Sequence, residues 1–141
     1  MSACLVSSIT EYCYADHQGR TDVLKSWTGN KTPQNTLSWL NSAKNHIVVA
    51  VPHGKDYVVG VGLLSDDEIS LCYVRHGYAN KGVGRLIMSN LELKAAATGI
   101  SRVHLWSTIT AKPFYEKLGY LQRGRPIHIA GLEGSRYEKD L

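Results

Sequence analysis

A glycine-rich loop is the first feature of the chain that could do chemistry. It joins an apolar, strand-like segment to a segment with helical spacing and reads Asn80-Lys81-Gly82-Val83-Gly84-Arg85. Glycines allow close approach of the backbone to a ligand, and the free N–H groups of a first helical turn attract anions. Lys81 and Arg85 add positive charge. The loop therefore predicts a phosphate site, with a plain tight turn as the alternative.

Length and composition indicate the class of protein that carries this loop. The 141 residues, 43% of them apolar and 20% charged, fit one globular domain over residues 1–141. The formal net charge of +4 favours an anionic ligand, which could be a phosphate-bearing cofactor or nucleic acid. Three cysteines without CxxC spacing favour a reducing cytoplasm, and the six histidines lack metal-binding spacing, so no metal is expected. No apolar run is long enough for a membrane span.

The elements that position the loop follow from hydrophobic periodicity. Before it, three short apolar runs with tight connections predict an antiparallel meander: His46–Val51, Tyr57–Leu64 and Glu68–Val74. Further upstream, we expect an edge strand within residues 1–15, a helix capped by Asp16 or Thr21 that runs to about Trp27, and a helix over residues 33–44.

After the loop, residues 85–98 have helical spacing and Gly99 is a plausible stop, while Arg102–Trp106 is a strand. A strand, a helix and a second strand in one sheet make a right-handed parallel crossover. A short helix over Ala111–Leu118 and extended segments over Leu121–Ile129 and Arg136–Leu141 complete the chain. The predicted class is α+β, with a mixed, mostly antiparallel sheet, one parallel β-α-β crossover and flanking helices.

Two segments resemble the signatures of the GNAT superfamily of N-acetyltransferases. Ala79 to Gly84 is similar to the motif [QR]-x-x-G-x-[GA] that follows an apolar strand, with Ala79 in place of Gln or Arg. Ala111 to Tyr120 is similar to A-x-x-[FL]-Y-x-x-x-G-[FY]. The resemblance covers about residues 46–141, includes the terminal strand and implies the GNAT fold.

The resemblance implies acetyl-CoA as acetyl donor. The N–H groups around Gly82, Val83, Gly84 and Arg85 would hold its pyrophosphate. The family's bulged third strand pairs with the pantetheine arm, and here the end of that strand includes Cys72, Tyr73 and Val74. A backbone N–H near Tyr73 or Val74 would polarise the thioester carbonyl. The resemblance also implies cofactor contacts by Asn80, Lys81, Thr108 and Phe114. Many members of the family carry Asn at the position of Thr108.

The resemblance also implies direct attack of an amine on the thioester in a ternary complex. It assigns Tyr115 as the acid that protonates the leaving thiolate; a core tyrosine is the alternative. Glu68, six residues before Val74, is the candidate base, often through water in the family, and a solvated turn carboxylate is the alternative. His76 and His128 are weaker candidates for the base.

The acceptor is a primary amine on a small molecule or peptide whose identity the sequence does not define. Ala79 and the open identity of the base motivate a second hypothesis, a CoA-binding or regulatory module with weak catalysis. A nucleic-acid-binding domain is a third, supported only by net charge and by no motif. Pairing of strands between two subunits would give a homodimer.

Overall fold

A six-stranded sheet forms the centre of the protein in the computed structural model, which describes residues 1–141. The strand order is β1-β2-β3-β4-β6-β5, and only β3 and β4 pair in parallel. This confirms the expected α+β class with one parallel crossover. The strands are β1 (Asn45–Ala50), β2 (Gly60–Ser65), β3 (Glu68–Val74), β4 (Arg102–Ser107), β5 (Leu121–Ile129) and β6 (Leu132–Asp140).

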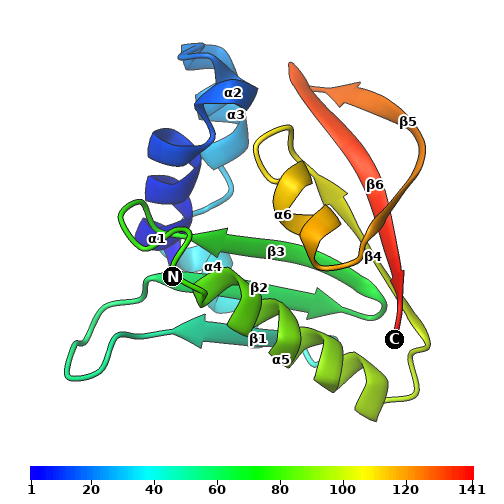
Figure 1. Ribbon diagram of the computed structural model, residues 1–141. Coiled ribbons are helices and arrows are strands. Elements are labelled where there is room, and N and C mark those ends of the chain that lie inside the picture. The colour runs from blue at the N-terminus through cyan, green and yellow to red at the C-terminus, as the bar shows by residue number, and fades with distance from the viewer.

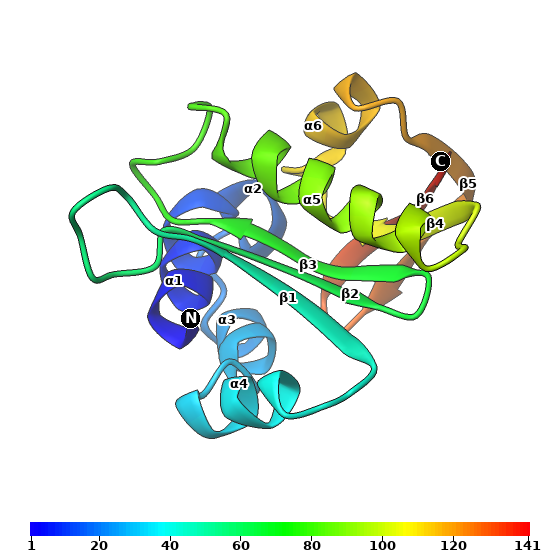
Figure 2. The same ribbon diagram turned by 90° about the horizontal axis from the view of Figure 1, so that it is seen from below.

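Helices lie on both sides of the sheet (Figure 1). They are α1 (Ser2–Ser7), η1 (Ser8–Tyr12, with π-helical bonding), α2 (Tyr14–His17), α3 (Thr21–Thr28), α4 (Pro33–Leu40), α5 (Val83–Ala97) and α6 (Lys112–Lys117). Seen from below, the helices up to α4 lie beneath β1 to β3, whereas α5 and α6 lie above the sheet (Figure 2). The lower face of β4, β6 and β5 has no helix over most of its area, although α2 contacts β6 near the β5–β6 turn. No helix combines the length and apolar character needed to cross a bilayer.

The N-terminal segment corrects the expectation of an edge strand within residues 1–15. These residues form α1, η1 and the start of α2. Leu5 and Ile9 are fully buried, and Cys4 beside them is also buried. Leu5 and Ile9 are four residues apart, which places them on one helical face. Burial of that face decides the helical state, because a strand would have pointed the neighbours Cys4 and Leu5 to opposite sides.

Helix α5 forms the crossover and packs on the sheet through Ile87, Met88, Leu91 and Ala95, all of which are buried. Gly62 in β2 lies directly beneath it. A Cβ at Gly62 would stand 2.3 Å from Ile87 Cγ2 and 3.0 Å from Leu91 Cδ1. The lack of a side chain there sets how closely α5 approaches the sheet, and thereby where the glycine loop at its start is held.

We expect Gly62→Ala to lower the free energy of unfolding by about 1–3 kcal/mol, because the added methyl group forces α5 away from β2. Urea denaturation measures the change. Gly134→Ala in β6 is the matched control, since its Cβ would meet only ordinary contacts at 3.7 and 4.0 Å. Equal stability of the two variants would show that α5 is not held by this close approach.

Candidate active site

A cavity of about 640 Å³ opens where β3 and β4 part. The two strands share a single register pair, Glu68 with His104, and diverge toward their carboxyl ends (Figure 1). Beyond that pair, the backbone groups of β3 that face β4 have no strand partner. The cavity lies in this gap and is lined from both sides of the sheet, by η1, the glycine loop, α5, β4 and α6.

A β-bulge at Ser70 contributes to the shape of β3. Opposite β2, Leu64 pairs with Ile69 and Leu63 with Leu71, which leaves Ser70 without a partner. An extra residue bends a strand and changes which face the following side chains occupy. The structure thus contains the bulge that the resemblance implied for this strand. Cys72, Tyr73 and Val74 follow the bulge and line the cavity, as does Ser70 itself.

The glycine loop stands at one end of the cavity. Gly82 is the N-cap of α5 with φ +86°, a conformation that favours glycine. No side chain caps α5 and its first turn carries no acidic residue, so its leading N–H groups remain available to an anion. Gly84 lies against α6, where a Cβ would be 3.1 Å from Phe114 Cζ. Arg85 and Lys117 are the only lining residues with a full positive charge.

Not every residue of the loop reaches the cavity. Asn80 lines it and donates from Nδ2 to the Tyr12 hydroxyl at 3.2 Å. Lys81 Nζ instead donates to the Gly77 carbonyl at 2.8 Å and lies over the Tyr78 ring. Val83 packs against the hydrophobic core beneath α5. Neither Lys81 nor Val83 lines the cavity, so any contact of theirs with a ligand would be through the backbone or at the outer rim.

Tyr115 on α6 lies in the cavity wall with only 6% of its surface exposed. Burial raises its pKa well above the ordinary range, and the neighbouring Cys72 thiol adds to the shift. Burial likewise raises the pKa of Cys72 to about 12, against a smaller opposing effect of a hydrogen bond from Tyr115. At neutral pH both groups therefore carry their protons, and Tyr115 is an acid rather than a base.

Glu68 lies at the closed end of the gap, outside the lining residues. Its carboxylate accepts from Ser70 Oγ at 3.3 Å and lies 3.5 Å from His104 Nε2, while Asp67 is 3.5 Å from His104 Nδ1. The Glu68 side chain is 42% exposed. Transfer of a proton from a group at the centre of the cavity to Glu68 would therefore need a bridging water molecule.

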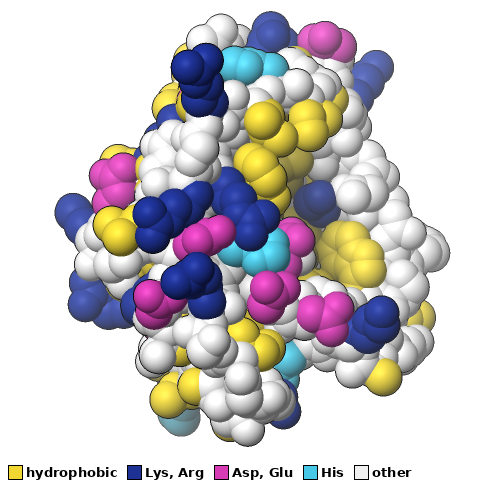
Figure 3. Space-filling view, turned by 90° about the vertical axis from the view of Figure 1, so that its right-hand side faces the viewer, with side chains coloured by type: hydrophobic (Ala, Val, Ile, Leu, Met, Phe, Trp, Pro, Cys, Tyr) yellow, Lys and Arg dark blue, Asp and Glu magenta, His cyan; other side chains and the backbone are white.

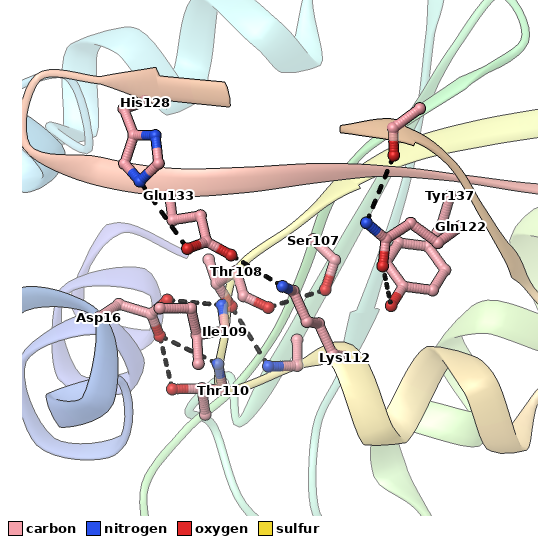
Figure 4. Close-up of polar contacts among 12 residues, drawn as sticks. Asp16, Ser107, Thr108, Ile109, Thr110, Lys112, Gln122, His128, Glu133 and Tyr137 are labelled. Atoms are coloured by element: carbon pink, nitrogen blue, oxygen red, sulfur yellow. Dashed lines mark hydrogen bonds and ion pairs between the residues drawn. The ribbon is translucent and has the colours of Figure 1, made fainter. Parts of the chain in front are cut away.

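The loop from β4 to α6 is fixed by a residue that sequence reasoning assigned to a different role. Asp16, expected as a helix cap, is buried in α2 and accepts from Ile109 N at 2.6 Å, Thr110 N at 3.2 Å and Thr110 Oγ1 at 2.5 Å (Figure 4). Thr108 Oγ1 in turn accepts from Ala111 N at 3.3 Å. Thr108 lines the cavity and shapes the turn that leads into α6.

A second carboxylate fixes the start of α6. Glu133 of β6 accepts from Lys112 Nζ at 2.8 Å and lies 3.7 Å from His128 Nε2 (Figure 4). The hydrogen bond from Lys112 lowers the pKa of Glu133. His128 thus faces Glu133 in the β5–β6 hairpin and does not line the cavity. Asp16 anchors the loop before α6 to α2, and Glu133 anchors α6, which carries Phe114 and Tyr115, to β6.

Several lining residues were not predicted as part of the site. Ser8, Tyr12 and Cys13 come from the segment that was expected to be a strand, and Trp106 comes from β4. The four-residue spacing of Leu5 and Ile9 is the sequence signal that could have placed the first three on a helix. Trp106 alternates with the buried residues Leu105 and Ser107, a period-two pattern that would place it on the opposite face.

The match to known proteins agrees with this geometry. The sequence model of the acetyltransferase (GNAT) domain matches residues 16–141. The chain belongs to the GNAT acetyltransferase family. No curated protein sequence matches it. Family membership supports acyl transfer in general and leaves the acceptor open.

Solved structures share the GNAT fold at low sequence identity. A GCN5-related N-acetyltransferase from Rhodopseudomonas palustris superposes with a TM-score of 0.85 at 23% identity, covering 99% of this chain and 87% of the other. A PaiA N-acetyltransferase from Thermoplasma acidophilum, solved in complex with coenzyme A, gives 0.78 at 16% identity, covering 99% and 92%. An acetyltransferase from Streptococcus agalactiae gives 0.69 at 22% identity, covering 99% and 91%.

We expect Asp16→Ala to destabilise the fold by about 1–3 kcal/mol, because it removes a buried carboxylate that accepts from the N–H groups of Ile109 and Thr110 and leaves them without that acceptor. Thermal and urea unfolding measure the loss. Thr110→Val removes one of the three donors and should cost less. The double variant should lose less stability than the sum of the losses in the two single variants, because both residues belong to one network. A loss equal to that sum would show that Asp16 and Thr110 are not energetically coupled.

Proposed function

We propose that the protein transfers the acetyl group of acetyl-CoA to a primary amine by direct attack in a ternary complex. The observation that carries the proposal is the cavity between the parted strands, which joins the free N–H groups at the start of α5 to the protonated Tyr115. Acetyl-CoA would supply an activated acetyl thioester with a thiolate leaving group. The residues around the cavity fit this molecule at three places.

Its phosphates fit the glycine loop. The N–H groups of Gly82, Val83, Gly84 and Arg85 would face the pyrophosphate, and the Arg85 and Lys117 side chains supply the positive charge of the cavity. Ala79, where the family motif has Gln or Arg, leaves this cradle intact because the donors are backbone groups. A cavity wall without any carboxylate suits a ligand with several phosphates.

The pantetheine arm fits the exposed edge of β3. Cys72, Tyr73 and Val74 present backbone groups that lack a partner on β4, and an amide-bearing chain could pair with them as a strand does. Thr108 and Phe114 would contact the arm from the other side of the gap. An N–H near Tyr73 or Val74 would stabilise charge on the thioester oxygen as the amine attacks.

Proton transfers follow from the two ionisable side chains. As the new N–C bond forms and the C–S bond breaks, Tyr115 would donate its proton to the departing sulfur. Glu68 would remove a proton from the ammonium form of the acceptor through water, so that a neutral amine attacks. The high pKa of Tyr115 keeps it protonated throughout the neutral and mildly alkaline range.

The two roles predict different pH profiles. Glu68→Gln should lower turnover at pH 7, and turnover should recover as the pH approaches the pKa of the acceptor amine, because the acceptor then needs no base.

Tyr115→Phe should lower turnover by about 10²–10⁴-fold at every pH, because general acid catalysis is lost. Release of free thiol from acetyl-CoA measures both, with a titration of acetyl-CoA to confirm unchanged cofactor affinity.

Unchanged turnover of Tyr115→Phe would remove Tyr115 as the acid. A Glu68→Gln deficit that persists at high pH would mean that Glu68 does not act as a base toward the acceptor. Acetyl-CoA binding with no thiol release for any amine would favour the alternative of a CoA-binding module, to which Ala79 points.

A further inference from the structure

A histidine at the closed end of the gap contacts the proposed base. His104 is the only residue of β4 that is paired in register with β3, and its partner is Glu68. The imidazole of His104 lies between two carboxylates: Nε2 is 3.5 Å from Glu68 Oε2, and Nδ1 is 3.5 Å from Asp67 Oδ2. Only 14% of the His104 side chain is exposed, so neighbouring atoms hold the ring in this place.

The two contacts fit the hydrogen-bonding capacity of the ring. An imidazolium has an N–H on each ring nitrogen, and each ring nitrogen of His104 faces one carboxylate. The backbone supports the same arrangement, because His104 N donates to the Asp67 carbonyl at 3.0 Å. A ring that is held at both nitrogens restricts the direction of the Glu68 carboxylate that it contacts.

The carboxylate on the other side of the ring has arginine partners. Glu138 of β6 is paired in register with His104. Glu138 Oε1 accepts from Arg136 Nε at 3.1 Å. Glu138 Oε2 lies 3.6 Å from Arg123 Nε and 4.0 Å from Arg102 Nη1. Because Glu138 has these cationic partners, it does not draw the imidazole away from the side of β3.

Ser70 connects Glu68 to the cavity. The Ser70 hydroxyl donates to Glu68 Oε1 at 3.3 Å, and Ser70 is the residue that the bulge in β3 leaves without a partner on β2. Ser70 lines the cavity, as does Trp106, which shares a face of β4 with His104 because side chains alternate along a strand. Figure 3 shows a histidine among acidic and basic side chains, beside a hollow lined by hydrophobic ones. The carboxylate and the ring therefore lie at the edge of the cavity.

We propose that His104 is a positioning residue for Glu68. His104 holds one carboxylate oxygen while Ser70 holds the other, so Glu68 keeps a fixed direction toward water at the edge of the cavity. This inference rests on the proposed acetyl transfer with Glu68 as the base. The acceptor ammonium gives a proton to a bridging water as that water gives one of its own to Glu68, and the half-exposed carboxyl then releases the proton to solvent. His104 acts only through Glu68 and carries no proton itself.

Two substitutions separate this role from a merely structural one. The side-chain amide of Gln places an N–H close to the position of histidine Nε2, whereas that of Asn places it close to the position of Nδ1. His104→Asn therefore removes the donor toward Glu68 and keeps one toward Asp67, and His104→Gln does the reverse. If the ring only tied β3 to β4, the two variants would have similar activities.

His104→Asn should lower turnover at pH 7 by about tenfold or more, whereas His104→Gln should keep most of it, because a displaced base loses much of its effect. The loss in His104→Asn should shrink as the pH approaches the pKa of the acceptor amine, as in Glu68→Gln, and KM for acetyl-CoA should not change. Thiol release from acetyl-CoA measures turnover, with the most reactive of four amines as acceptor: tyramine, spermidine, glucosamine and L-lysine.

The double variant of Glu68→Gln and His104→Asn should be no slower than Glu68→Gln alone, because the two residues act as one unit. His46→Asn is the matched control, a half-buried histidine of β1 at the far edge of the sheet, and should leave turnover unchanged. Equal losses in His104→Asn and His104→Gln, a loss as large at high pH as at pH 7, or additive losses in the double variant would overturn the inference and leave acetyl transfer standing.

Failure of the underlying function gives a different result. If none of the four amines releases thiol with the wild-type protein while acetyl-CoA still binds, amine acetylation itself is wrong and this assignment falls with it. If the wild-type protein is active and Glu68→Gln shows no deficit, acetylation stands, but Glu68 is not the base and His104 has no base to position.

Discussion

The parting of two parallel strands is the constraint on which the rest of the structure depends. β3 and β4 are hydrogen-bonded neighbours in the sheet, yet they share one register pair, at Glu68 and His104. Unpaired backbone groups inside a protein are costly, so an opening of this kind persists only where the surrounding elements hold it and where water or a ligand can satisfy the exposed groups. Helix α5, the bulge at Ser70 and the anchored α6 supply that support.

The opening also divides the site into two chemical environments. On the side of α5 and α6, backbone N–H groups and two cations favour phosphates. On the opposite side, the half-exposed Trp106 lines the cavity, and Glu68 and His104 lie at its closed end. Between them lies Tyr115, whose burial keeps it protonated. Asp16 and Glu133 connect these parts, because one carboxylate joins α2 to the loop before α6 and the other joins α6 to the β5–β6 hairpin. A disturbance at α2 or at the β5–β6 hairpin can therefore reach the helix that carries Tyr115.

Local patterns in the sequence predicted much of the architecture. The bounds of β3 and β5 agree with the predicted segments, and Gly99 adopts the positive φ expected after a helix. The glycine loop and the segment around Tyr115 combine short-range turn and helix signals, so they were recognisable in a single chain. Tyr57 to Val59 were expected in a strand that begins only at Gly60, although Val59 still donates to the Ala50 carbonyl and accepts from Arg75 N.

What the sequence could not predict depends on contacts between distant residues. Asp16 and Thr110 are 94 positions apart, and nothing local distinguishes a buried acceptor from a helix cap. Arg102, Arg123 and Arg136, which approach Glu138, likewise come from different strands. Helices α1 and η1 were missed, whereas α3 and α4 were predicted, because the strands that α1 and η1 cover are formed by residues much later in the chain.

The central claim is that acetyl-CoA lies between β3 and β4 with its phosphates at the start of α5. Amide chemical-shift mapping of the isotope-labelled 141-residue protein during an acetyl-CoA titration tests it most directly. The account predicts saturable changes that are largest at Cys72 to Val74, at Gly82 to Arg85 and at Tyr115, with little change along β1. No saturation at millimolar acetyl-CoA, or changes centred away from the gap, would contradict it.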